Sequence, residues 1–314
     1  MALIRDFGDL QAEIVRLRNA GQLSEALDLI RREGHRFPDQ AAYTYLASMR
    51  LNCELGLIDE GVRVLAEALA AGCRYPLPVL QNEQFKPLRD VAEFQRLAHH
   101  AAMRYDSELG ATTPKLVVRR PASTPVGTLL VLHGNNSSTD QTAPHWEHAR
   151  ELRWVLAFAQ SAEISWSPGL FVWNDPARAR SQVLQHLAEL SESVEPPHLP
   201  IVLAGFSMGA LRALELAASV ADRMSGVIAV GAYLPHDAAE HLAASLSIPT
   251  AIVIGERDEE GRPGSETIER GLRERGVPVR LEVVPGLGHD YPSDVARRFE
   301  TALSLFSRST SGTV

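Results

Sequence analysis

The chain has 314 residues, of which 45% are hydrophobic and 22% charged, and this composition is ordinary for a globular protein. A formal net charge of −8 and the lack of a basic stripe give no reason to expect nucleic-acid binding. Cys53 and Cys73 are the only cysteines, which excludes a disulfide framework.

The N-terminal residues Met1–Asp6 are not followed by the apolar stretch that a secretory signal needs. No run approaches the roughly 18 apolar residues of a membrane-spanning helix. We therefore expect a cytoplasmic protein with no membrane span.

Residues from about 6 to 105 show helical patterns with glycines between them, and a weak internal repeat. The stretch Ala20–Leu27 recurs loosely, 35 positions later, as Leu55–Val62. The repeat resembles the tetratricopeptide repeat, which has a small residue, a bulky residue and a helix-ending proline at fixed positions. In the first copy these positions hold Ala26, Ile30 and Pro38. In the second copy they hold Gly61 and Leu65, and Cys73 replaces the proline. The sequence predicts a helical, tetratricopeptide-like domain over residues 1–110.

Two roles are open for this helical region. Residues 1–105 would form a groove that holds a peptide, a carrier domain or another protein partner, or they would form a layer that stabilises or covers the neighbouring domain. Arrays of this kind usually need three repeats to be stable alone. We therefore expect the region to pack on its neighbour.

From Thr112 onward apolar runs alternate with helical patterns, which predicts βαβ units and a mostly parallel sheet over residues 111–314. Residues 160–175, rich in Ser, Pro, Gly and aromatics, predict a loop or lid, and residues 195–200 predict the loop before another strand. The expected strands are Leu116–Arg119, Gly127–Leu132, Trp154–Ala159, Ile201–Ala204, Gly226–Val230, Thr250–Ile254 and Val279–Val284.

The motif Gly205-Phe206-Ser207-Met208-Gly209 lies between the apolar run Ile201–Ala204 and a helical pattern. A serine at a sharp strand-to-helix turn needs small residues around it, and its side chain is exposed beside the N–H groups of the helix N-terminus. This context predicts that Ser207 is a catalytic nucleophile.

Such a serine needs a base and an acid that orients the base. Asp258 follows the strand Thr250–Ile254, and His289 lies in the glycine-flanked loop after the strand Val279–Val284, so both fall at the carboxyl edge of a parallel sheet. We assign Asp258 as the acid and His289 as the base. Their competitors are Glu256 and Glu259 for the acid, and His236 and His241 for the base.

An oxyanion hole needs two N–H donors. The first is the main-chain N–H of Met208, and the second is that of Asn135, with Asn136 as the alternative, in the loop after the strand Gly127–Leu132. Because these donors belong to the main chain, we expect a substitution that keeps the backbone in place to cost little. We expect His133 to support this loop.

Together, the His133-Gly134 pair, the Gly205–Gly209 motif, Asp258 and Gly288-His289-Asp290 resemble the α/β-hydrolase superfamily. The likeness is greatest to its carboxylesterase/phospholipase-type, acyl-thioesterase-like branch, although Asn135-Asn136 replace the usual glycine and aspartate. The resemblance implies an α/β-hydrolase fold and a serine hydrolase that cleaves a small-molecule carboxylic ester or thioester without a cofactor. The alternatives are an acyltransferase or cyclase with the same triad, a peptidase, and a non-catalytic interaction protein on a vestigial hydrolase fold.

Two further patterns surround these motifs. His145 and His148 mimic metal-ligand spacing, but they lack the His-Glu-x-x-His pattern, so we expect no metal site. The four tryptophans cluster between Trp146 and Trp173, and aromatic side chains suit the walls of a small-molecule site. We predict a substrate pocket lined by Phe206, Trp146, Trp173 and Tyr291.

Overall fold

The computed structural model describes residues 3–193 and 199–307, so most of the loop expected over residues 195–200 lies outside the described residues. The chain divides into two compact units. The first comprises Met1–Thr112 together with Ile164–Leu170, and the second comprises Thr113–Glu163 and Phe171–Val314. A short segment from the middle of the chain therefore belongs to the N-terminal unit, which the composition of the sequence did not indicate.

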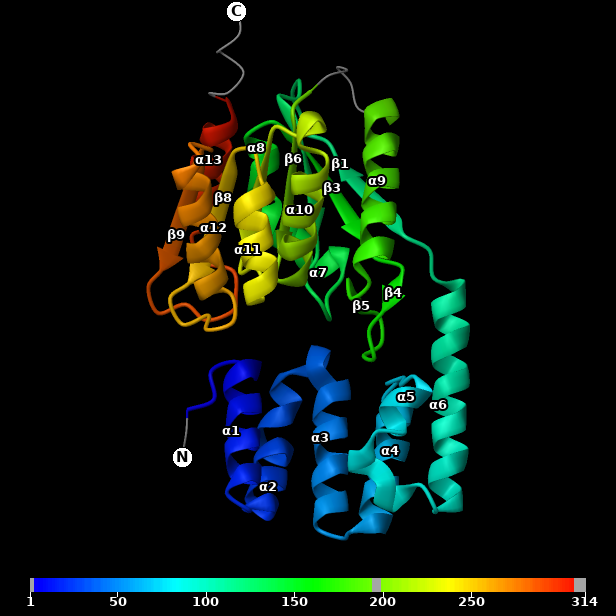
Figure 1. The fold of residues 1–314 in the computed structure, drawn as a ribbon. Coiled ribbons are helices and arrows are strands. Elements are labelled where there is room, and N and C mark those ends of the chain that lie inside the picture. The colour runs from blue at the N-terminus through cyan, green and yellow to red at the C-terminus, as the bar shows by residue number, and fades with distance from the viewer. Residues whose placement is uncertain (1–2, 194–198, 308–314) are drawn as a thin grey trace, which may run out of the picture. The chain divides into compact units, whose positions relative to one another are not determined.

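The first unit is helical (Figure 1). The turns between α1 and α2 and between α3 and α4 each contain a glycine in the left-handed region, Gly21 at φ +74° and Gly56 at φ +73°. These two glycines give the 35-residue repeat its physical basis. The helices are α1 (Phe7–Asn19), α2 (Leu23–Glu33), α3 (Ala41–Glu54), α4 (Ile58–Ala70), α5 (Leu77–Leu80) and α6 (Ala92–Ala111), with 3₁₀ turns at Gly34–Arg36, Pro38–Gln40 and Glu83–Leu88.

The second unit contains a seven-stranded sheet in the order β1-β3-β2-β6-β7-β8-β9. All pairs are parallel except that of the edge strand β1 with β3. The structure thus confirms a mostly parallel sheet flanked by helices. The strands of this sheet are β1 (Lys115–Arg119), β2 (Gly127–Leu132), β3 (Trp154–Gln160), β6 (Ile201–Phe206), β7 (Gly226–Val230), β8 (Thr250–Gly255) and β9 (Val279–Val284).

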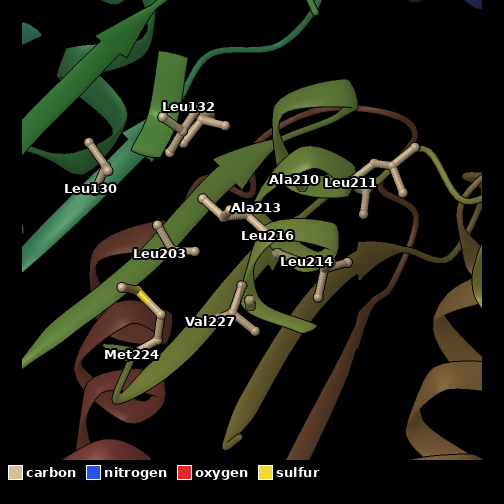
Figure 2. Close-up of a cluster of buried hydrophobic side chains, with 14 of the residues drawn as sticks. Leu130, Leu132, Leu203, Ala210, Leu211, Ala213, Leu214, Leu216, Met224 and Val227 are labelled. Atoms are coloured by element: carbon tan, nitrogen blue, oxygen red, sulfur yellow. The ribbon is translucent and has the colours of Figure 1, made fainter. Parts of the chain in front are cut away.

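Helices cover both faces of the sheet because successive side chains of its central strands, which are buried and mostly apolar, point to opposite faces. One core contains Leu203 of β6 and Val227 of β7, gathered with Ala213 and Leu216 of α10 (Figure 2). This face is covered by α9 (Pro176–Ser193), α10 (Met208–Ser219), α11 (His236–Ser245) and α12 (Arg262–Glu274), and the other by α7 (Thr139–Trp146), α8 (His148–Glu151) and α13 (Val295–Ser307).

Residues 160–175, expected as a loop or lid, contain two short strands, β4 (Glu163–Ile164) and β5 (Phe171–Val172), which pair with each other. The connection between them, residues 165–170, is part of the helical unit. A 3₁₀ turn, Ala221–Arg223, completes the regular elements among the described residues. None of the described helices combines the length and the apolar character needed to cross a lipid bilayer.

Candidate active site

Ser207 lies at the turn between β6 and α10, with φ 55° and ψ −122°. A non-glycine residue adopts such a conformation only where its surroundings hold it there. The N–H of Ser207 donates to the carbonyl oxygen of Val230 at 3.0 Å, and its own carbonyl oxygen accepts from the N–H groups of Ala210 at 3.1 Å and Tyr233 at 3.2 Å. These bonds to β7, to α10 and to the loop after β7 fix the strained turn.

The two glycines of the motif have no room for a side chain. A Cβ atom on Gly205 would lie 2.5 Å from the carbonyl carbon of Gly209, and one on Gly209 would lie 2.6 Å from the carbonyl oxygen of Leu132. Both obstacles are main-chain atoms, which cannot yield as a flexible side chain can. The glycines thus allow α10 to begin directly against the ends of β6 and β2.

Asp258 and His289 reach Ser207 from the ends of two neighbouring strands. Asp258 lies in the turn between β8 and α12, is only 3% exposed, and accepts the Gly261 N–H at 3.0 Å through Oδ1. Its Oδ2 is 2.7 Å from His289 Nδ1, and His289 Nε2 is 2.8 Å from Ser207 Oγ. Because a carboxylate only accepts hydrogen bonds, Nδ1 carries the proton and Nε2 faces the serine hydroxyl as an acceptor.

The competing acids and bases have other partners. Glu256 accepts the main-chain N–H of Gly286 at 2.8 Å, which ties the loop after β8 to the loop after β9. His236 begins the surface helix α11, and its Nε2 lies 3.3 Å from a carboxylate oxygen of Glu240 on the same helix. Of the four competitors, none hydrogen-bonds Ser207 or His289 in the part of the chain that the structure describes.

The surroundings of His289 act on its pKa in opposite directions. Desolvation is the largest single influence and lowers the pKa, since burial disfavours the imidazolium. The hydrogen bond to Asp258 and the negative charges of Asp258, Glu260 and Asp290 stabilise the imidazolium and together outweigh the desolvation. The pKa of His289 therefore lies above its ordinary value of 6.5. The His289 side chain keeps 41% of its surface exposed, so a small molecule has access to it.

The loop after β2 contains Asn135, and its side chain has an unexpected role. Asn135 Oδ1 accepts the main-chain N–H of Trp173 at 2.7 Å, and Nδ2 donates to Asn174 Oδ1 at 2.8 Å. The carboxamide therefore ties the loop to the segment after β5, and a substitution that removes it takes away a support of the loop backbone. Met208, by contrast, is the first residue of α10, where no carbonyl of the helix accepts its N–H.

His133 supports the same loop from the protein interior. It is buried, its Nδ1 donates to the Gly134 carbonyl oxygen at 2.7 Å, and its Nε2 accepts the Ser161 N–H at 3.2 Å. Burial lowers the pKa of His133 to about 4, so the ring is neutral near pH 7 and keeps one tautomer. The Trp173 indole N–H donates to the His133 carbonyl oxygen at 3.0 Å, which adds a third tie to this loop.

Sequence reasoning missed the support that Trp173 receives from α10. Arg212 is nearly buried, donates through Nε to the Trp173 carbonyl oxygen at 3.0 Å, and pairs with Glu215 through Nη1 at 2.5 Å. One signal for this role was present in the sequence. A charged residue on the core-facing side of an otherwise apolar helix usually has a buried partner.

The aromatic residues expected around the substrate fall into two groups. Trp146 and Trp173 are each 0% exposed, which corrects the prediction that they line a pocket, since neither ring is accessible. Trp146 stacks on Phe299 in the core. Phe206 and Tyr291 are partly exposed and stack on each other with ring centroids 4.4 Å apart, and the Phe206 ring lies beside that of His289, with centroids 5.2 Å apart.

The two histidines with metal-ligand spacing point to different partners. His145 stacks on Tyr291 with ring centroids 3.9 Å apart, whereas His148 pairs with Glu151 and Glu300. Over residues 3–193 and 199–307, no three side chains of His, Cys, Asp or Glu converge as metal ligands would.

Comparisons with known proteins agree with this architecture. Residues 170–303 match the model of the dienelactone hydrolase family. None of the curated proteins compared with the chain is similar to it in sequence. Among solved structures, an uncharacterized protein from Bacillus cereus ATCC 10987 is similar over 95% of this chain and 98% of its own, at 22% identity and a TM-score of 0.54.

Two esterases are similar over somewhat less than two thirds of the chain. Esterase PE8 covers 61% of this chain and 98% of its own, at 19% identity and a TM-score of 0.52. A thermostable carboxyl esterase from Bacillus coagulans covers 64% and 95%, at 16% identity and a TM-score of 0.51. The second unit thus has the α/β-hydrolase fold, and the family match supports a hydrolase built on that fold.

Proposed function

We propose that this protein is a serine hydrolase that cleaves a small-molecule carboxylic ester or thioester through an acyl-enzyme intermediate. The observation that carries the proposal is the continuous hydrogen-bonded chain from Asp258 through His289 to Ser207 Oγ, at distances of 2.7 and 2.8 Å. It ends at a serine held in a strained turn at the start of a helix, where the hydroxyl lies beside unpaired N–H groups.

In the first half of the reaction, Ser207 Oγ attacks the acyl carbon while its proton passes to His289 Nε2. The main-chain N–H groups of Met208 and Asn135 hold the negative oxygen of the tetrahedral intermediate. The bond to the leaving group then breaks, and the alcohol or thiol departs with the proton from Nε2. The Asp258 carboxylate orients His289 and stabilises its imidazolium form, and it remains ionised throughout.

In the second half, water attacks the acyl-enzyme and gives its proton to His289 Nε2. The second tetrahedral intermediate collapses, Ser207 Oγ takes the proton back, and the carboxylic acid leaves. The Phe206 ring, next to His289, and the Tyr291 ring that stacks on it would form an apolar wall for the acyl group.

The comparisons support the choice of bond. The family name specifies hydrolysis of a dienelactone, which is a cyclic carboxylic ester, and two similar structures are named as esterases. The finer likeness to the carboxylesterase/phospholipase-type branch, including thioesters as substrates, rests on the sequence motifs alone.

A fluorophosphonate probe tests the proposal, because it modifies only a serine that an adjacent base activates. We expect stoichiometric labelling of Ser207 in the wild-type protein, none in Ser207→Ala, and little in His289→Ala. His236→Ala is the matched control, since His236 lies on the surface helix α11 and pairs with Glu240. Folded wild-type protein that neither reacts with the probe nor turns over small esters would refute the proposal.

A further inference from the structure

The segment Ile164–Leu170 lies between two stretches of the chain that form the second unit, but it belongs to the helical unit. Ile164, Ser165, Ser167 and Leu170 are buried. The loop is closed at its base by the Ser165 N–H, which donates to the Leu170 carbonyl oxygen at 2.8 Å. We refer to residues 164–170 as the tip, and to the flanking residues 161–163 and 171–174 as its two arms.

Arg74 binds the main chain of the tip at three successive residues. Its N–H donates to the Trp166 carbonyl oxygen at 2.9 Å, and its guanidinium donates to those of Ser165 at 3.0 Å and Ser167 at 3.3 Å. Arg74 is only 6% exposed and forms an ion pair with Glu108 of α6. A buried arginine whose guanidinium donates to two carbonyl oxygens and one carboxylate holds a loop in one conformation.

The Trp166 side chain anchors the tip to the helical core. Its ring lies 5.0 Å from that of Tyr43 and 6.2 Å from that of Tyr75, at the margin of the helical core. The Tyr75 hydroxyl donates to the Ala42 carbonyl oxygen at 2.9 Å, which keeps its ring in place. Arg74, Tyr43 and Tyr75 of the helical unit thus form a binding site for the tip.

The two arms lead from the tip directly to the loop at residues 133–137. On the first arm, the Ser161 N–H donates to His133 Nε2. On the second arm, Phe171 and Ser137 exchange main-chain hydrogen bonds at 2.9 and 3.4 Å, and Trp173 and Asn174 bind the Asn135 carboxamide. Both arms therefore end on the loop that contains the proposed oxyanion donor.

We infer that Arg74 and Trp166 of the helical unit are positioning residues for the proposed oxyanion hole. By fixing the tip, they fix the arms, and the arms hold the 133–137 loop so that the Asn135 N–H faces the reacting oxygen. The inference rests on the proposed function, and it gives the helical unit a role in catalysis that needs no external partner. A misplacement of about 1 Å in such a donor can cost about 100-fold in rate.

The test uses the full-length protein and Trp166→Ala, with Trp166→Phe as the conservative replacement. Two quantities are measured: steady-state kcat and KM for a p-nitrophenyl ester, and hydrogen–deuterium exchange of the peptide covering residues 133–138. For Trp166→Ala we expect kcat to fall about 10- to 100-fold with KM nearly unchanged. We also expect faster exchange in residues 133–138 but not in the peptide covering residues 201–216, and substantial recovery of both quantities in Trp166→Phe.

The matched control is Phe37→Ala, which removes an equally half-buried aromatic ring that packs on Phe7 elsewhere in the helical unit. Its kcat and its exchange at residues 133–138 should equal those of the wild type. Arg74→Lys provides a second variant, since it keeps the charge opposite Glu108 but not the planar fork that binds two carbonyl oxygens. It should change both quantities in the same direction as Trp166→Ala.

The inference is overturned if folded Trp166→Ala and Arg74→Lys keep the wild-type kcat. It is also overturned if exchange at residues 133–138 stays unchanged, or if Phe37→Ala lowers kcat equally. Failure of the proposed function gives a different result. In that case the wild-type protein itself turns over no ester and resists the fluorophosphonate, whereas the exchange measurement still reports whether the tip holds the loop.

Discussion

At the scale of single residues, the environment of His289 combines a buried carboxylate with a half-exposed imidazole. Asp258 keeps its hydrogen bonds to Gly261 and His289 away from solvent, while Nε2 of His289 faces Ser207 at the surface. A general base is useful when its pKa lies near the working pH, and the raised pKa of His289 suits that role. The same residues therefore determine how activity should depend on pH.

We expect kcat/KM to rise with pH through the pKa of His289, because only the neutral imidazole accepts the Ser207 proton. Since the pKa is raised, the acid limb should lie above pH 6.5. Asp258→Asn removes the negative charge that raises the pKa and leaves the desolvation that lowers it. In this variant the acid limb should move to lower pH, and the maximal rate should fall about 10⁴-fold. A pH profile of ester hydrolysis checks both, and an acid limb that does not move in Asp258→Asn would contradict the assignment.

Gly209→Ala tests the steric argument at the turn. The added methyl group would meet the main-chain carbonyl oxygen of Leu132, so α10 must shift away from β2. We expect a loss of about 1–3 kcal/mol in the free energy of unfolding and a fall in kcat/KM of about 100-fold. Chemical denaturation and ester kinetics measure the two effects.

Gly110→Ala is the control for this substitution, because a Cβ atom there meets nothing within 4 Å. It lies near the end of α6, where alanine favours the helix by up to about 1 kcal/mol. If both substitutions had equal effects on activity, the crowding at Gly209 would not matter for the site.

At the scale of elements, the loop after β2 depends on the two arms, residues 161–163 and 171–174. His133, Asn135 and Ser137 each bind a residue of the arms, through a ring nitrogen, a carboxamide and the main chain respectively. In α/β-hydrolases the position of this loop decides where an oxyanion donor points. A neighbouring segment thus replaces the rigidity that a regular element would provide.

Asn135→Ala should therefore be harmful although the proposed donor is the main-chain N–H. The substitution leaves the Trp173 N–H and the Asn174 side chain without their partner, at about 1 kcal/mol for each hydrogen bond. We expect a stability loss of about 2 kcal/mol and a tenfold or greater fall in kcat. Asn82→Ala, which removes a cap of a 3₁₀ turn in the helical unit, should leave kcat unchanged. Wild-type kcat in Asn135→Ala would show that the loop needs no such tie.

At the scale of the whole molecule, the chain crosses between its two units at Thr112–Thr113, at Glu163–Ile164 and at Leu170–Phe171. The helical unit is therefore not a simple N-terminal extension, because its compact body includes residues from the middle of the chain. Truncation at the sequence boundary near residue 111 would leave the tip without the residues that bury it.

We expect deletion of residues 1–111 to give insoluble protein, because the apolar side chains of Ile164, Trp166 and Leu170 lose their partners. Deleting residues 1–111 and also replacing residues 164–170 by an Asn-Gly turn should restore solubility, since this dipeptide closes a short hairpin by itself. The soluble fraction and size-exclusion profile of both proteins measure this. Soluble, monodisperse protein from the simple truncation would show that the tip needs no cover.

The sequence by itself determined the class of the second unit and the residues of its proposed site. Strand-length apolar runs alternating with helical patterns require a parallel sheet, and the ends of parallel strands bring Ser207, Asp258 and His289 to one edge. These are local signals that combine through a simple topological rule. The likeness of residues 1–110 to tetratricopeptide repeats and the catalytic roles remain predictions.

Only the tertiary structure decided which side chains are enclosed and which segments pack together. The sequence shows where the aromatic residues cluster, but not whether an aromatic ring lines a pocket or packs in the core. Trp146 and Trp173 proved to be fully buried. The partners of Asn135, Arg74 and Trp166 lie between 34 and 123 positions away along the chain. Contacts between positions so distant in the sequence leave no local pattern, because they form only when the chain has folded.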